Sequence, residues 1–218
     1  MQRNSKPHKK PRKNKKFRWG LLTKWLTTTF HPTSVADVAG GKGMLSYMLI
    51  KEGWRSTVID PIDQPLLEKF TDLEGNRIRI QDLKQVTRIN KPFSPELVKD
   101  MQLIVGMHAH GCNMEIMNLC KETNKDFVLV PCCVIDEPIE KQHGVNWQLS
   151  LIEYAENLGL KPKTLKLNFK GKNIVIYTDR CLRRRYPDKT DNELAKDILK
   201  GIVIDEKLVT VPDGRQVG

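Results

Sequence analysis

The sequence predicts an α/β fold: a doubly wound, mostly parallel, seven-stranded Rossmann-like sheet with an antiparallel terminal hairpin. Three observations lead to this fold class. Short β-branched runs alternate with segments of helical periodicity, which is typical of strand–helix–strand units. A glycine-rich turn at residues 39–43 joins the first of these strands to the next helix. Two later β-rich runs flank Lys170-Gly171-Lys172, which predicts a hairpin and therefore an antiparallel element.

The predicted elements begin with an amphipathic helix that starts at Gly20 and ends before Pro32. Strands and helices then alternate, and a capping box of Thr190 and Glu193 opens a last helix that runs to Leu199. The predicted strands cover residues 34–38, 55–59, 77–80, 102–107, 127–131, 164–169 and 173–178, and the helices between them cover residues 44–52, 65–70, 113–123 and 146–158.

The net charge of +11 is concentrated at the start of the chain. Residues 1–36 contain ten of the 37 Lys and Arg residues and no acidic residue, so the rest of the chain is nearly neutral. We expect residues 1–18 to be a disordered basic tail, residues 19–200 a Rossmann-like domain, and residues 201–218 a C-terminal extension. Such a tail neutralises phosphates, which makes RNA the expected partner; a nuclear localisation signal and a solubilising extension are the alternatives.

The composition argues against several classes of protein. No apolar run approaches the roughly 20 residues of a membrane helix, and no apolar segment follows the basic N-terminus as in a secretory signal. The five cysteines include no Cys-x-x-Cys pair, so we expect reduced thiols instead of a disulfide framework. The sequence therefore predicts an intracellular monomer without a membrane partner, located in the cytoplasm or in the nucleus and nucleolus.

The segment from Asp37 to Gly43 carries the most informative motif. A strand runs into a glycine-rich bend, where the absence of Cβ atoms lets a ligand approach the backbone. The bend matches neither the phosphate P-loop nor the dinucleotide fingerprint, because Lys42 is followed by glycine and Ser46 replaces the last glycine. Asp37 would repel a pyrophosphate and suits a cationic, amine-bearing ligand. Asp60 ends the next strand, 23 residues later, where an acid accepts hydrogen bonds from ribose hydroxyls.

At these residues the chain resembles the class I S-adenosylmethionine-dependent methyltransferases, whose glycine motif is an acid followed by x-G-x-G-x-G. Asp37, Gly41 and Gly43 match that motif, and Ala39 stands at the first glycine position. The resemblance implies S-adenosylmethionine as the cofactor. The cofactor-binding residues that it implies are Asp37 near the amino group, Gly40, Gly41 and Gly43 along the methionine and ribose, Asp60 on the ribose, and Asp82, at the end of the third predicted strand, near the adenine amino group.

Two further turns resemble a methyltransferase-like subfamily that has a Gly-Leu/Met-His turn after the fourth strand and Pro-Cys-Cys after the fifth. In this chain the two turns are residues 106–108 and 131–133. The carboxyl ends of neighbouring parallel strands meet at one edge of a sheet. We therefore expect His108 and His110, which follow the fourth strand, to line one cleft with Cys132 and Cys133, which follow the fifth.

Three interpretations of this cleft stay open. In the first, His108 is the catalytic general base, since imidazole titrates near physiological pH, and His110 and Cys132 bind substrate. In the second, a metal of zinc type is bound by His108, His110, Cys112 and Cys132 or Cys133. In the third, a hydrogen-bonded histidine and small buried cysteines are structural. We expect no metal to be required, because the sulfonium of the methyl donor is already activated.

The other expected substrate-binding residues are arginines that follow the hairpin. They are Arg183, Arg184 and Arg185, in a basic cluster that begins at Arg180. Together with the tail they favour RNA, either tRNA or rRNA, as the substrate of a methyltransferase. A protein methyltransferase is one alternative. A catalytically silent RNA-binding protein of the same fold is the other, because the Asn/Asp-Pro-Pro-Tyr/Phe signature of base N-methylation does not follow the fourth strand.

Overall fold

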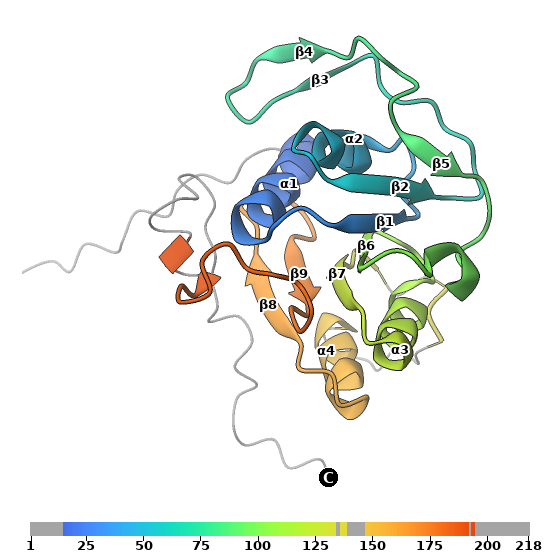
Figure 1. Ribbon diagram of the computed structural model, residues 1–218, viewed down its shortest axis with the longest axis vertical. Helices are drawn as coiled ribbons and strands as arrows, with labels where there is room; N and C mark the ends of the chain where they lie inside the picture. The colour runs from blue at the N-terminus through green and yellow to red at the C-terminus, as the bar shows by residue number, and fades with distance from the viewer. Residues whose placement is uncertain (1–14, 134–135, 139–146, 192, 195–218) are drawn as a thin grey trace, which may run out of the picture.

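The computed structural model describes residues 15–133, 136–138, 147–191 and 193–194 of the chain. Its centre is a sheet of seven strands in the order β5-β2-β1-β6-β7-β9-β8 (Figure 1). The strands of this sheet are β1 (Ser34–Val38), β2 (Arg55–Ile59), β5 (Thr87–Ile89), β6 (Leu103–Met107), β7 (Asp126–Val130), β8 (Lys163–Lys166) and β9 (Ile174–Tyr177). The helices are α1 (Arg18–Thr29), α2 (Met44–Lys51), α3 (Asn113–Thr123) and α4 (Trp147–Asn157), with 3₁₀ turns at Lys15–Phe17 and Pro95–Val98.

The order of the strands makes the sheet doubly wound. β1 pairs in parallel with both β2 and β6, so the chain builds outward to β5 on one side and then returns to build β6 and β7 on the other. β9 pairs antiparallel with both β7 and β8 and so closes the sheet with a hairpin. The predicted fold class, a mostly parallel Rossmann-like sheet with an antiparallel terminal hairpin, is confirmed.

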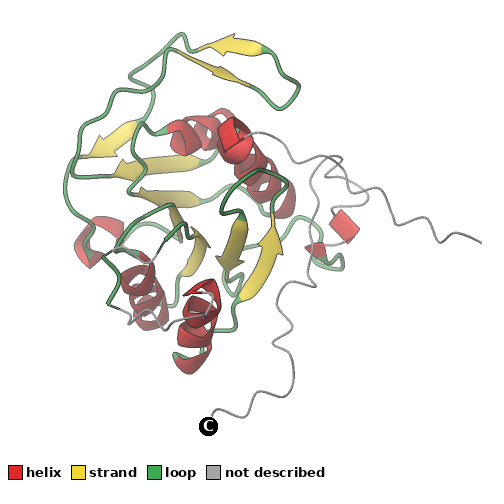
Figure 2. Cartoon of the chain, turned by 180° about the vertical axis from the view of Figure 1, so that it is seen from behind, coloured by secondary structure: helices red, strands yellow, loops and turns green. Residues whose placement is uncertain are grey.

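Helices cover both faces of the sheet (Figure 2). The core layer between the sheet and helices α1 and α2 includes Trp25 of α1, and the layer between the sheet and helices α3 and α4 includes Met117 of α3; both side chains are fully buried. Successive side chains of β6 point to opposite faces of the sheet: Val105 packs in the first of these layers and Ile104 in the second. A strand that is buried on both faces needs a continuous apolar run, which explains why β6 was readily predicted.

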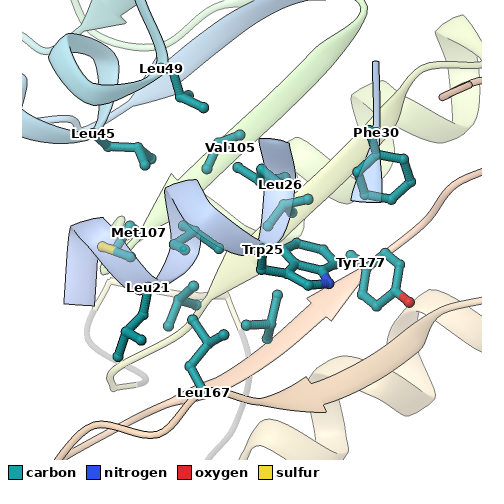
Figure 3. Packing of buried hydrophobic residues seen from close by; sticks show 14 of the residues in the cluster. Leu21, Trp25, Leu26, Phe30, Leu45, Leu49, Val105, Met107, Leu167 and Tyr177 are labelled. Carbon is teal, nitrogen blue, oxygen red and sulfur yellow. The ribbon is translucent and has the colours of Figure 1, made fainter. Parts of the chain in front are cut away.

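Among the described residues, Trp25 of α1 is the largest fully buried side chain (Figure 3). Its indole ring makes edge-on contacts with Tyr177 of β9 and with Phe30 just after α1, at centroid distances of 4.9 and 5.7 Å. Aromatic groups of this size contribute much of the buried area of a core. They fix the end of α1 beside the hairpin, where Phe30 also forms a β-bridge with Arg184.

The sequence prediction is wrong between β2 and β6. Residues 65–70 do not form the predicted helix, and the strand predicted at 77–80 does not join the main sheet. Instead, β3 (Lys69–Thr71) and β4 (Arg77–Arg79) form a separate antiparallel ribbon, whose turn is closed by hydrogen bonds from Asn76 to the carboxylate of Asp72. The third parallel strand is β5, which has three residues and an arginine at its centre. Such a strand contains no apolar run that could be detected in the sequence.

Differences at the two ends of the chain are smaller. α1 begins at Arg18, two residues before the predicted start, and Lys15–Phe17 forms a 3₁₀ turn within the segment predicted to be disordered. The capping box is confirmed by reciprocal hydrogen bonds between Thr190 and Glu193. The rest of the predicted last helix, the tail up to residue 14 and the extension 201–218 lie outside the described residues. In the described part of the chain, no helix is both long and apolar enough to cross a membrane.

A buried carboxylate fixes the amino edge of the sheet. Asp126, at the start of β7, is fully buried and accepts hydrogen bonds at 2.7–2.9 Å from the backbone N–H groups of Arg180, Cys181 and Leu182. The hydroxyl of Thr178 donates to the same carboxylate at 2.7 Å. Several donors are needed to replace the water that a carboxylate loses on burial. The segment after β9 is therefore held against the start of β7.

We expect Asp126→Asn to lower the free energy of unfolding by about 3 kcal/mol, because the amide sets an NH₂ group against backbone donors and removes the charge that strengthens each bond. Urea denaturation followed by circular dichroism measures the change. Asp188→Asn, at an exposed position in the segment after β9, is the matched control and should change this free energy by less than about 0.5 kcal/mol. Equal stabilities of the two variants would contradict the anchoring role of Asp126.

Candidate functional site

Four loops meet at the carboxyl edge of the parallel strands. They follow β1, β2, β6 and β7, whose registers pair Val38 with Ile59 and Gly106, and Met107 with Val130. Ligands of open α/β sheets bind at this edge, beside the point where the strand order reverses. In this sheet the reversal lies between β1 and β6. The candidate site therefore consists of residues from these four loops.

The loop after β1 is a tight bend that requires glycine. Gly41 and Gly43 have φ angles of +54° and +75°, which glycine adopts without strain. At Gly40 an added Cβ atom would lie 2.7 Å from Cγ of Asp37, closer than non-bonded carbon atoms approach. Ala39, where the motif has its first glycine, also has a positive φ, of +52°. The outer side of the bend is open, because a Cβ at Gly41 would meet its nearest atom only at 3.9 Å.

Asp37 lies beneath this bend and is almost completely buried. Its Oδ2 atom accepts a 2.9 Å hydrogen bond from the hydroxyl of Ser46 in α2, and that hydroxyl lies 2.8 Å from Ser56 Oγ. Burial raises the pKa of Asp37 to about 6, against the opposing effects of the Ser46 hydrogen bonds and the charge of Arg88. Its side chain is bonded to α2, so an effect on a ligand above the bend would be electrostatic. The predicted role of Asp37 near an amino group stays a prediction.

Asp60 follows β2 and holds the bend from the other side. Its Oδ2 accepts the backbone N–H of Gly41 and its Oδ1 that of Ile62, both at 2.9 Å. Arg88 of β5 donates to the carbonyl oxygen of Gly41 at 2.8 Å. No feature of the sequence marks Arg88, because the contact depends on the unpredicted strand β5. Two carboxylates, Asp37 and Asp60, therefore lie at the bend, together with Arg88, which pairs with Asp63 at 3.4 Å, and with the exposed Lys42.

Asp82 does not occupy the position predicted for it. It is exposed between β4 and β5, and its carboxylate accepts the backbone N–H of Lys84 at 2.9 Å. The error follows from the β3–β4 ribbon, whose second strand resembles a strand of the main sheet in sequence. Asn90 is the residue that directly follows the third parallel strand. The contact with adenine is implied for the residue after the third parallel strand. That residue is Asn90, and Asp82 instead follows a strand outside the main sheet.

His108 directly follows β6 and has a φ angle of +62°. Its backbone N–H donates to the carbonyl oxygen of Val130 at 3.0 Å, while its imidazole Nε2 is buried without a hydrogen-bond partner among the described residues. Burial, followed by the charges of Arg18 and Lys15, lowers the pKa of His108 to about 4. The imidazole is therefore neutral and only weakly basic near pH 7. Titration near physiological pH, the reason for predicting a general base, is wrong for this residue.

His110 and the two adjacent cysteines come together from different loops, as predicted. Nε2 of His110 lies 2.9 Å from Sγ of Cys132 and 3.4 Å from Sγ of Cys133. Among the described residues, His108 and Cys112 do not join this group, although one interpretation of the sequence included them. Burial raises the pKa of Cys112 to about 11, as expected for a packed thiol at the start of α3. The binding of substrate by His110 and Cys132 stays a prediction.

The arginines after the hairpin lie at the opposite, amino edge of the sheet. Asp126 at the start of β7 holds their segment, and the backbone N–H of Arg185 donates to the carbonyl oxygen of Thr29 at the end of α1. β7 has five residues, so its length of about 16 Å separates them from the carboxyl edge. The predicted substrate-binding cluster is thus remote from the glycine bend.

Arg184 has structural partners within that segment. Its guanidinium donates to Asp179 and Asp191, both at 2.8 Å, and lies over the ring of Phe30. Arg180 likewise pairs with Asp126. Of the arginines predicted to bind substrate, Arg183 and Arg185 are exposed, and for these two the prediction stays untested. A phosphate would have to displace two carboxylates to reach Arg184.

The raised pKa of Asp37 predicts that stability depends on pH. The carboxyl group has its ordinary pKa near 4 in the unfolded chain and about 6 in the folded protein, so folding tightens proton binding. The resulting stabilisation is complete below about pH 4 and is lost as the pH rises through about 6. Relative to Asp37→Asn, we expect wild-type protein to lose about 2 kcal/mol of unfolding free energy between about pH 4 and 7.

Urea denaturation at a series of pH values measures this difference. Asp188→Asn, which removes an exposed carboxylate at the amino edge, is the control and should follow the pH trend of the wild-type protein. A difference between wild type and Asp37→Asn that stays constant over this pH range would show that Asp37 has an ordinary pKa in the folded state.

No protein-family model and no curated protein matches the chain. Among solved structures it is similar to precorrin-6y C5,15-methyltransferase from Geobacter metallireducens, with 15% identity, coverage of 72% of this chain and 82% of that chain, and a TM-score of 0.40. It is also similar to a SAM-dependent methyltransferase from Archaeoglobus fulgidus, with 13% identity, coverage of 73% and 90%, and a TM-score of 0.46. A third similar structure is the mitomycin 7-O-methyltransferase MmcR, with 11% identity, coverage of 76% of this chain and 54% of that chain, and a TM-score of 0.40. At these identities and TM-scores, the similarity assigns no activity to the chain.

Proposed function

We propose that the protein transfers a methyl group from S-adenosylmethionine to RNA, with the cofactor bound over the glycine bend at the carboxyl edge. One observation carries this proposal: two carboxylates, Asp37 beneath the bend and Asp60 beside it, flank an open glycine backbone. The neighbouring Arg88 is engaged by Asp63 and by the carbonyl oxygen of Gly41. Such a site attracts a sulfonium and an amine and repels a phosphate ester.

The residues at the bend fit a positively charged nucleoside. Each carboxylate oxygen of Asp60 accepts one backbone N–H, which leaves lone pairs for the two hydroxyls of a ribose. Gly41 leaves room above the backbone, because no atom lies closer than 3.9 Å to the position of a Cβ. Asp37 would contribute its charge from below. Asn90, instead of Asp82, would lie near the adenine.

S-adenosylmethionine, when bound, supplies a methyl group that is already activated by the positive charge on sulfur. The chain's own residues then have to hold an acceptor in line with that methyl group, and orientation alone can supply a large part of the rate enhancement. His108 is neutral and mostly enclosed, so it is not assigned as a base. Alignment by the loops after β6 and β7 is the role proposed for this edge.

The basic tail joins the domain at the same edge as the bend. α1 begins at Arg18, and the charges of Arg18 and Lys15 act on His108 at the carboxyl end of β6. Residues 1–16 contain eight Lys and Arg residues. Such a segment would bring a polyanion to the carboxyl edge, whereas the arginines after β9 lie at the amino edge. The tail is therefore the surface that we propose for RNA.

We expect Asp60→Ala to weaken the binding of S-adenosylmethionine about 10- to 100-fold, because it removes the charged acceptor for ribose hydroxyls and the bond that fixes Gly41. Isothermal titration calorimetry on the full chain measures this change. Asp188→Ala removes an exposed acid at the opposite, amino edge of the sheet and should bind like the wild type. Unchanged affinity in Asp60→Ala would remove the ribose assignment. Tight binding of ATP, without binding of S-adenosylmethionine or its demethylated product, would overturn the cofactor.

With a labelled methyl donor, we expect label to enter total RNA and not total protein. Replacing the eight Lys and Arg residues of 1–16 by Gln should weaken RNA binding and slow this transfer. The slope of log affinity against log salt concentration should fall by about 0.7 to 0.9 for each phosphate that the protein no longer neutralises. Fluorescence anisotropy at several salt concentrations measures the slope.

The matched control is Arg183→Gln/Arg185→Gln, which removes exposed charge from the amino edge and should keep both RNA affinity and methyl transfer. Loss of RNA binding in this control alone would move the binding surface to the amino edge. Label in protein alone would replace RNA by a protein substrate. Label in neither pool, with RNA binding intact, would indicate a catalytically silent RNA-binding protein.

A further inference from the structure

Three side chains that carry nitrogen or sulfur ligands for a metal ion come together at the carboxyl edge of the sheet, the same edge as the glycine bend. His110 offers Nε2, and Cys132 and Cys133 offer their sulfur atoms, which lie 3.4 Å apart. Both sulfurs are 2.9–3.4 Å from the imidazole nitrogen. The three ligand atoms therefore surround a single point, and no other group of this kind is found in the described part of the chain.

The sheet itself brings the three residues together. Met107 and Val130 are paired in the parallel register of β6 and β7, so the residues that follow them leave the sheet side by side. The backbone N–H of His108 then donates to the carbonyl oxygen of Val130, and Gln148 of α4 donates to that of Pro131. Both loops are thus fixed by hydrogen bonds just before the ligand residues.

The loop that carries His110 is also fixed on its far side. A Cβ atom at Gly111 would lie 2.9 Å from Cβ of Asp136, so the chain beyond the cysteines passes directly against it. The next residue, Glu137, accepts backbone N–H groups of Asn113 and Met114 at the start of α3. These contacts hold His110 in front of the cysteines without using any of the three ligand atoms.

Packing does not account for this cluster. Cys120 shows what a structural cysteine looks like in this protein: it is fully buried in α3, and its sulfur points to a backbone oxygen. Cys132 and Cys133 are instead half-buried, with their sulfurs turned toward the exposed His110. Two thiols and an imidazole at the carboxyl edge of the sheet are arranged as ligands for an ion.

We propose that His110, Cys132 and Cys133 bind a thiophilic divalent ion of the zinc class at the carboxyl edge. Tetrahedral zinc with these ligands requires about 3.8 Å between the sulfurs and about 3.6 Å from sulfur to nitrogen. The three distances here are shorter by less than about 1 Å, so small side-chain rotations make room for the ion. Each thiol releases its proton to solvent on binding. Three protein ligands leave a fourth position for water or a substrate group, as in zinc sites that keep an open position.

Cobalt(II) is the probe for this site, because its absorption reports thiolate ligands and tetrahedral geometry directly. The full chain, reduced with a phosphine and freed of metal by a chelator, is titrated with Co²⁺ under anaerobic conditions. We expect one equivalent to bind with a thiolate charge-transfer band in the near ultraviolet and intense d–d bands in the visible. Zn²⁺ should displace the cobalt and abolish both sets of bands.

Three variants locate the site, and one serves as the control. Cys132→Ser and Cys133→Ser should each weaken Co²⁺ binding by more than about 100-fold, beyond the loss typical of outer-shell changes. His110→Asn alters an exposed side chain, leaves the fold intact, and should shift the d–d bands while it weakens binding. Cys181→Ser removes an exposed thiol elsewhere and should titrate like the wild type.

The absence of a charge-transfer band in the wild-type protein would overturn the proposal. So would cobalt binding that persists in the Cys132→Ser/Cys133→Ser double variant, or a His110→Asn variant whose bands and affinity are those of the wild type. Circular dichroism of each variant establishes that the fold is retained. None of these measurements depends on methyl transfer, so the metal site and the proposed activity are tested separately.

Discussion

The buried carboxyl group of Asp37 is the constraint on which the carboxyl edge depends. Ser46 donates to it from α2, and the backbone at Gly40 passes so close that a Cβ atom would overlap it. A polar contact in such apolar surroundings is strong when it is satisfied and costly when it is broken. The strand, the bend and the helix are therefore tied at one point, and the positions of Gly41 and of its partner Asp60 follow from that point.

Charged residues have different roles at the two edges of the sheet. At the amino edge, Asp126 and Arg184 have all their charge matched by hydrogen bonds and ion pairs, and this fixes the hairpin and α1. At the carboxyl edge, two carboxylates are held against the glycine bend, and His110 and Cys132 face each other from the loops after β6 and β7. Basic residues that look alike in the sequence thus differ in role according to the edge at which the topology places them.

The parallel sheet was predictable because most of its strands are short β-branched runs between helices, and the bend was predictable because positive φ angles demand glycine. β5 was missed because its three residues centre on Arg88, and the position of Asp82 was wrong for the same reason. Contacts between distant residues, such as Arg88 with Gly41, leave no local pattern. They follow from the order of the strands, which only the assembled sheet reveals.

The direction of α1 determines where the N-terminal segment is attached. α1 starts beside His108, so residues 1–14 join the domain at the carboxyl edge. Fourteen residues reach at most about 50 Å, and one molecule confined to a hemisphere of that radius is present at a local concentration in the millimolar range. A molecule captured by that segment would be tethered at such a concentration, so even a fleeting contact with the edge would be repeated many times before the captured molecule diffused away.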